Sequence, residues 1–159
     1  MRKIQFILTI ISLLFAGSVN AESGWHVEGT QTTITITIEG KKGPVYVTCL
    51  INFNPETNCF PEIGLLIVTD KKLGKFIDHQ MAKDSMSIYI DSNKPWKERT
   101  AIAKYSNGFE ATIIGNDRII EEIETGNEVF MSPFPGYTHF AFPLNGASAT
   151  IEKAKSYCR

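Results

Sequence analysis

The chain has 159 residues and a formal net charge of −1, with 16 basic and 17 acidic side chains. This length suits one domain with a buried core. The near balance of charge provides no basic face of the kind that follows the phosphates of a nucleic acid. The composition therefore argues against a nucleic-acid partner.

The N-terminus has the pattern of an export signal. Two basic residues precede an apolar stretch over residues 4–16, and residues 19–21, "VNA", then match the small-residue pattern that signal peptidase accepts. The stretch is shorter than the about 20 residues that a membrane-spanning helix needs. We therefore predict a cleaved signal peptide over residues 1–21 and one exported domain over residues 22–159. We expect no membrane segment after cleavage, and a location in the periplasm or, if the protein is secreted, outside the cell.

Alternating apolar residues predict strands through the first half of this domain. Residues 32–40 alternate isoleucine with threonine, which is the two-residue period of a half-buried strand. Residues 45–53 alternate again and place Cys49 on the apolar face. The segment "NPETN", residues 54–58, has the composition of a turn, and the apolar run over residues 63–70 predicts a central strand.

The second half continues this pattern and adds two helices. Strands are predicted over residues 85–91, 100–105, 109–114, 127–131 and 138–144. Asn107-Gly108 is a strong hairpin signal. Residues 116–126 predict a short helix that ends at Gly126, and residues 145–159 predict a closing helix. The pattern favours a mainly β fold, an antiparallel β-sandwich or barrel-like domain, with the two helices closing an edge or an end.

Cys49 and Cys59 are more consistent with a disulfide than with a metal site. Thiols tend to pair in the oxidising compartments outside the cytoplasm, whereas a structural zinc site needs four closely spaced ligands. Pairing Leu50 with Asn58 and Ile51 with Thr57 across the predicted turn would place Cys49 opposite Cys59, within the Cα separation of about 4.4–6.8 Å that a disulfide requires. Cys158 leaves two other pairings open, Cys49–Cys158 and Cys59–Cys158. We predict no metal.

No catalytic motif is present, since the chain has no G-x-S-x-G, no H-E-x-x-H and no phosphate-binding glycine loop. We therefore predict no catalytic residue and no cofactor. Asp78 and His79 could form an acid–base or metal-binding pair. The many lysines around them make a charged surface loop the simpler interpretation.

An aromatic and proline-rich segment over residues 130–143 is the strongest candidate for binding. Aromatic side chains held by prolines form rigid recognition surfaces, and Phe134 and Tyr137 are the predicted contacts. The alternative is that the aromatic residues of this segment belong to the core. Trp96, beside basic residues, is a second candidate, and it could equally fill one end of the sandwich.

Three motifs have a counterpart in one known family. They are the hairpin cysteines Cys49 and Cys59, the segment Ile90–Pro95 of the type iDxgkP, and a helix–Gly126–strand unit followed by Phe142, Leu144, Gly146 and Ile151. With these motifs the chain resembles the invasion-associated locus B family of exported bacterial proteins. The resemblance implies an exported β-domain and favours the Cys49–Cys59 bridge. It implies no particular reaction.

We therefore predict a non-enzymatic exported domain that binds a protein or an envelope component. A first alternative is a small periplasmic hydrolase or metal-dependent enzyme with Asp78 and His79 in its site. A second is a periplasmic inhibitor or immunity protein that blocks an enzyme. A buried Asp–His pair in a cleft would favour the enzyme, and a projecting loop at Phe134–Tyr137 would favour the binding domain.

Overall fold

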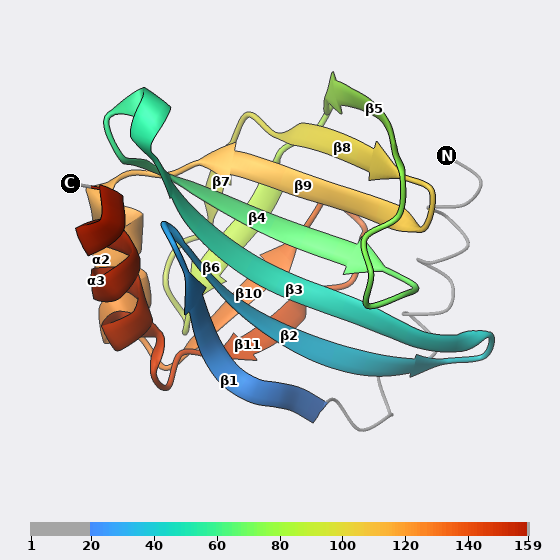
Figure 1. The fold of residues 1–159 in the computed structure, drawn as a ribbon, viewed down its shortest axis with the longest axis horizontal. Coiled ribbons are helices and arrows are strands. Elements are labelled where there is room, and N and C mark those ends of the chain that lie inside the picture. Colours follow the sequence, from blue (N-terminus) through green and yellow to red (C-terminus); the bar gives the residue numbers. More distant parts are fainter. Residues whose placement is uncertain (1–19, 159) are drawn as a thin grey trace.

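The computed structural model describes residues 20–158, with side chains from residue 24 onwards. Two antiparallel sheets form the layers of a sandwich, and two helices lie side by side at one end of it (Figure 1). The prediction of a mainly β fold with a short helix and a C-terminal helix is confirmed. The predicted signal peptide lies outside the described residues, apart from Asn20 and Ala21, which begin the first strand.

The larger sheet has the strand order β1-β2-β3-β4-β9-β8-β5. Its strands are β1 (Asn20–Glu28), β2 (Gln31–Gly40), β3 (Gly43–Asn54), β4 (Phe60–Val68), β9 (Gly108–Ile114), β8 (Ala101–Tyr105) and β5 (Phe76–Met81). Every second residue of β2 is buried up to Ile38, as the isoleucine–threonine alternation predicts. The apolar run that predicts a central strand forms β4, between β3 and β9.

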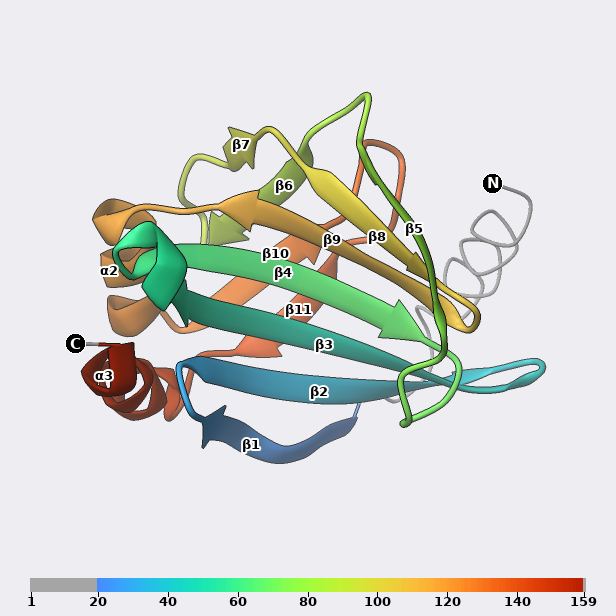
Figure 2. The same ribbon diagram turned by 45° about the horizontal axis from the view of Figure 1, so that its top comes forward.

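The smaller sheet has the order β11-β10-β6-β7 and covers one face of the larger sheet (Figure 2). Its strands are β11 (Phe140–Pro143), β10 (Glu128–Ser132), β6 (Met86–Ile90) and β7 (Trp96–Glu98). The core lies between the two sheets. Its largest fully buried side chains are Ile34, Ile51, Ile63, Leu65, Ile67, Met86, Ile88, Ile90, Phe109, Ile113 and Phe142. Each such side chain contributes about 1.5–3 kcal/mol by leaving water.

The two helices form as their sequences predict. α2 (Asp117–Thr125) is capped by Asn116, whose side chain accepts a hydrogen bond from the N–H of Ile119 at 3.1 Å. α3 (Ala147–Cys158) buries an apolar face against β1, β2, β3 and α2. None of the described helices is long and apolar enough to cross a membrane.

The disulfide corrects the favoured cysteine pairing. Cys59 is bonded to Cys158, and Cys49 is a free thiol buried in the core. Neither the Cys49–Cys59 bridge nor the Cys49–Cys158 alternative is formed, and the bond is the third of the possible pairings.

The register of β3 and β4 explains this difference. Asn54 pairs with Phe60, so the turn holds five residues, including the 3-10 helix η1 (Pro55–Thr57), and Cys49 faces Leu65. Cys59 has a left-handed backbone with φ +61°, as does the residue before it. Cys59 therefore belongs to the turn and not to the strand, and it lies against the end of α3.

Candidate functional site

The aromatic loop predicted as a recognition surface packs against the core. Tyr137 is only 4% exposed, and its ring meets the half-buried ring of Phe134 edge to face at 4.9 Å. Both rings also contact Phe109 in the core. The Ser132 hydroxyl lies 3.0 Å and 3.1 Å from the carbonyl oxygens of Phe134 and Tyr137, which holds the loop closed. A projecting surface at these two residues is therefore not observed.

Asp78 and His79 lie on the edge strand β5, in which every side chain is exposed. The carboxylate of Asp78 accepts a hydrogen bond from the backbone N–H of His79 at 2.7 Å, so this N–H of the edge strand has a partner. Among the side chains of residues 24–158, no group of three or more His, Cys, Asp or Glu residues is arranged to hold a metal ion. This pair is exposed on an edge and is not set in a cleft.

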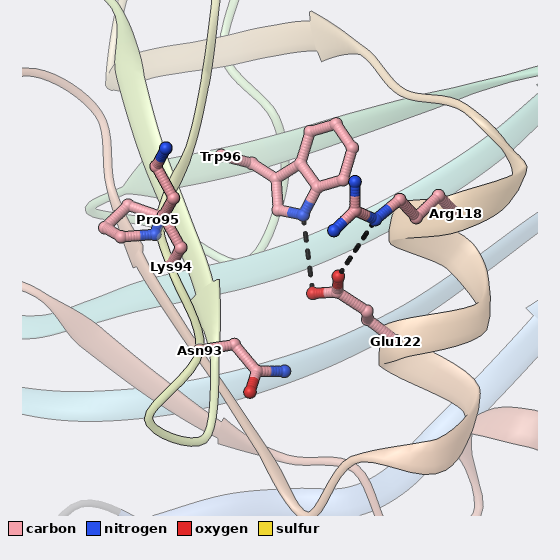
Figure 3. Close-up of a pocket in the computed structure, with 6 residues that line it drawn as sticks. All are labelled: Asn93, Lys94, Pro95, Trp96, Arg118 and Glu122. Carbon is pink, nitrogen blue, oxygen red and sulfur yellow. Dashed lines mark hydrogen bonds and ion pairs between the residues drawn. The ribbon is translucent and has the colours of Figure 1, made fainter.

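Trp96, the other predicted binding residue, lies in a shallow pocket of about 440 Å³ (Figure 3). The pocket lies between the helix α2 and the segment that connects β6 to β7. Its lining residues are Asn93, Lys94, Pro95, Trp96, Arg118 and Glu122. Trp96 is partly exposed there, and of the three predicted binding residues it is the one that lines this pocket.

Glu122 holds the two larger side chains of this pocket together. Its Oε2 accepts from the indole Nε1–H of Trp96 at 3.4 Å, and its Oε1 lies 3.7 Å from Nε of Arg118 (Figure 3). The guanidinium of Arg118 lies over the indole, 5.6 Å from the ring centre, within the range of a cation–π contact. The aromatic ring, the cation and the carboxylate are therefore oriented by one another.

Asp91 fixes the wall of the pocket that precedes β7. Its carboxylate accepts from the backbone N–H of Asn127 at 3.2 Å and of Glu128 at 3.0 Å, and its own N–H donates to the Glu128 carbonyl at 2.9 Å. Asn93 closes the turn by donating its N–H to the carbonyl of Ile90 at 3.0 Å. The loop that carries the pocket is thereby tied to the end of β10.

Gly126 fixes the opposite wall. A Cβ at this position would lie 2.2 Å from Cγ2 of Ile90 and 2.9 Å from the carbonyl oxygen of Glu122. Only glycine allows the end of α2 to approach β6 this closely. Asp91 and Gly126 belong to two of the motifs that carry the family resemblance. They do not line the pocket but position the two segments that do.

Arg118 and Glu122 were not predicted as site residues. Their side chains are exposed and half-buried, respectively, which is the ordinary pattern of the solvated face of a helix. The available signal was an Arg–Glu pair four residues apart near a helix start, together with a tryptophan after a proline turn. Sequence spacing alone does not show that these two segments meet.

Comparisons with known proteins give no match: no protein-family model matches the chain, and neither a curated protein nor a solved structure is significantly similar to it. The resemblance to the invasion-associated locus B family therefore stays a prediction that its motifs carry. The candidate site is argued from its own geometry.

Proposed function

We propose that this protein is an exported bacterial binding domain of the invasion-associated locus B type, without enzymatic activity. It binds an envelope component or a protein through the Trp96 pocket, in the periplasm or outside the cell. A disulfide between residues far apart in the chain supports an oxidising compartment, where such bonds persist.

The observation that carries the proposal is the mutual orientation of Trp96, Arg118 and Glu122. Ligand sites are usually concave and preformed, with an aromatic surface and a few oriented polar groups. In this pocket the polar groups are held before any ligand arrives. The Asp91 carboxylate ties one wall to β10, and Gly126 allows the other wall to approach β6 closely. Pre-organisation of this kind reduces the entropy that is lost on binding.

The enzyme alternative was based on Asp78 and His79. Asp78 and His79 are exposed on β5, and neither lines the Trp96 pocket. The inhibitor alternative is a special case of protein binding, and the same experiment tests it.

The proposal is tested by capture from an envelope extract of the producing bacterium. The oxidised exported chain is immobilised as wild type, as Trp96→Ala and as Tyr157→Ala, and the eluted complexes are weighed by native mass spectrometry. Tyr157 is an exposed aromatic on α3 outside the pocket lining, so its variant controls for non-specific binding by an exposed aromatic ring. We expect the same bound species on wild type and Tyr157→Ala, and its loss from Trp96→Ala. Equal capture by all three chains, or none by any, contradicts the proposal.

A further inference from the structure

We infer that the ligand of the Trp96 pocket is a sugar acid, a saccharide ring that carries a carboxylate beside free hydroxyl groups. This inference rests on the proposed function and specifies the chemistry of the ligand. It depends on three properties of the pocket: an oriented cation, an acceptor beside it, and an aromatic wall.

Arg118 supplies the oriented cation. Its Nε lies 3.7 Å from Glu122, and its two terminal nitrogens donate no hydrogen bond to any side chain or backbone group among residues 24–158. The side chain is 78% exposed, yet its guanidinium is held over the ring of Trp96. A planar guanidinium fork matches a carboxylate through two parallel hydrogen bonds. Lys94, on the other wall, adds a second positive charge.

Glu122 selects against an anion that has no hydrogen-bond donors. Its carboxylate lies in the same pocket and repels a bare negative group such as acetate or phosphate. A carboxylate has about four acceptor sites, and the contacts at 3.4 Å and 3.7 Å involve one site on each oxygen, so acceptor sites remain for a ligand. A ligand must therefore bring donors for Glu122 as well as a negative charge for Arg118.

A ring that carries both hydroxyl groups and a carboxylate meets both demands. Each hydroxyl donates one hydrogen bond and accepts others, and the side-chain amide of Asn93, which has no hydrogen bond within the described chain, offers one group of each kind. The apolar edge of a sugar ring can contact the indole of Trp96. The pocket is shallow and about 440 Å³ in volume, near the lower end of ordinary ligand sites, which suits one residue of a longer glycan.

The test uses the indole N–H signals in an NMR titration of the oxidised exported chain. The chain has two tryptophans, so two indole signals are expected, and Trp96→Phe identifies the one from the pocket. The probes are glucuronic acid against glucose and glucuronamide, and N-acetylmuramic acid against N-acetylglucosamine. The first set represents an acidic polysaccharide and the second a cell-wall glycan, so they distinguish the two sources of the same chemistry. Acetate, inorganic phosphate and glycine are titrated in parallel.

We expect at least one acid to shift the Trp96 signal with saturation, and its neutral partner to bind at least tenfold more weakly. Arg118→Gln should remove this tenfold preference, while Arg99→Gln, an exposed arginine outside the pocket lining, should retain it. Glu122→Gln should weaken both members of a pair, because both donate hydroxyl groups to the carboxylate.

Equal binding of acid and neutral sugar overturns the inference, and so does stronger binding of acetate, phosphate or glycine than of any sugar acid. If envelope capture depends on Trp96 and no sugar acid shifts its indole signal, the ligand class is wrong and the proposed function stands. If capture also fails, both are wrong.

Discussion

Cys59 and Cys158 are joined by a disulfide with their Cα atoms 5.9 Å apart, although 99 residues separate them in the chain. The bond ties the turn between β3 and β4 to the end of α3, which itself packs on β1, β2, β3 and α2. It therefore closes a loop that contains most of the fold.

Removing this bond is expected to cost much of the stability of the domain. In the chain-entropy model a loop of about 100 residues gives about 4.7 kcal/mol, and losses of about 2–5 kcal/mol are usual. We expect the double variant Cys59→Ser/Cys158→Ser to lose that much free energy of unfolding in urea. Cys49→Ala is the control: it keeps the bridge and loses only a buried sulfur, at a cost of about 1–2 kcal/mol. A double variant as stable as wild type would show that the bridge does not stabilise the fold.

Cys49 is expected to be inert in the folded protein. It is fully enclosed, and burial raises the pKa of its thiol to about 12. Because the thiolate is the reactive form, iodoacetamide at pH 8 should not modify the native chain. After denaturation without reductant, intact mass should show one added group. Fast modification of the native chain, or none after denaturation, contradicts this prediction.

Glu110 is expected to make stability depend on pH. Its side chain lies on the outer face of the larger sheet, where burial first, and then the charge of Glu62, raises its pKa, although a hydrogen bond from Thr112 opposes the shift. A carboxyl whose pKa is raised by folding stabilises the fold below its unfolded pKa near 4.3. That contribution is lost as the pH rises through the folded pKa.

Glu110→Gln should therefore melt higher than wild type at pH 7, and the difference should shrink as the pH falls toward 4. The amide oxygen still accepts from Thr112, so the change isolates the charge. Glu39→Gln, at an exposed carboxylate on β2, is the control and should leave the melting temperature nearly unchanged at both pH values. A gain from Glu110→Gln that is equal at pH 4 and pH 7 would not be electrostatic.

Local patterns predicted most of the core elements. Alternating residues located β2 and β3, and the Asn107-Gly108 hairpin and the short helix that ends at Gly126 were found from residue types alone. The patterns did not predict β1, β5 or β7. In β1, Trp25 is the only buried side chain among residues 24–28. β5 is exposed along its whole length, so it has no apolar period, and β7 has only three residues.

The site was harder to predict because it depends on contacts between distant segments. Trp96 could be identified as a surface aromatic, but its partner Glu122 is placed by the packing of α2 against β6, which Gly126 permits. The prediction of the turn before β4 was wrong for a local reason. Two residues with a left-handed backbone, Asn58 and Cys59, belong to the turn and not to β4. The predicted register placed the turn earlier in the chain, so it paired the wrong residues of the two strands.

Asp91 is expected to stabilise the fold and the pocket loop together. Asp91→Ala removes the acceptor of two backbone N–H groups and leaves a residue with a Cβ at φ +53°. We expect a loss of about 2–3 kcal/mol in free energy of unfolding, with weaker ligand binding. Asp91→Asn keeps one acceptor oxygen and tolerates the left-handed backbone, so it should lose less than half as much. Equal losses in the two variants would contradict a role for the carboxylate as acceptor.

Tyr137 carries a hydroxyl that the core does not satisfy. Its oxygen is buried without a hydrogen-bond partner among residues 24–158, and burial raises the pKa of the phenol above its usual range. A buried polar atom without a partner costs about 1–3 kcal/mol, whereas the ring itself contacts Phe109, Phe134 and Phe140. The hydroxyl and the ring should therefore act on stability in opposite directions.

Tyr137→Phe keeps the ring and is expected to leave the free energy of unfolding unchanged or to raise it by about 1 kcal/mol. Tyr137→Ala removes the ring and should cost about 3–5 kcal/mol. Since folding raises the pKa of the phenol, wild type should also lose stability as the pH rises above the unfolded value near 10, and Tyr137→Phe should resist alkaline unfolding better. Urea unfolding at pH 7 and at pH 10.5 measures both effects. A clear loss of stability in Tyr137→Phe at pH 7 would mean that the hydroxyl has a partner, such as a bound water, and that it helps to hold the loop closed.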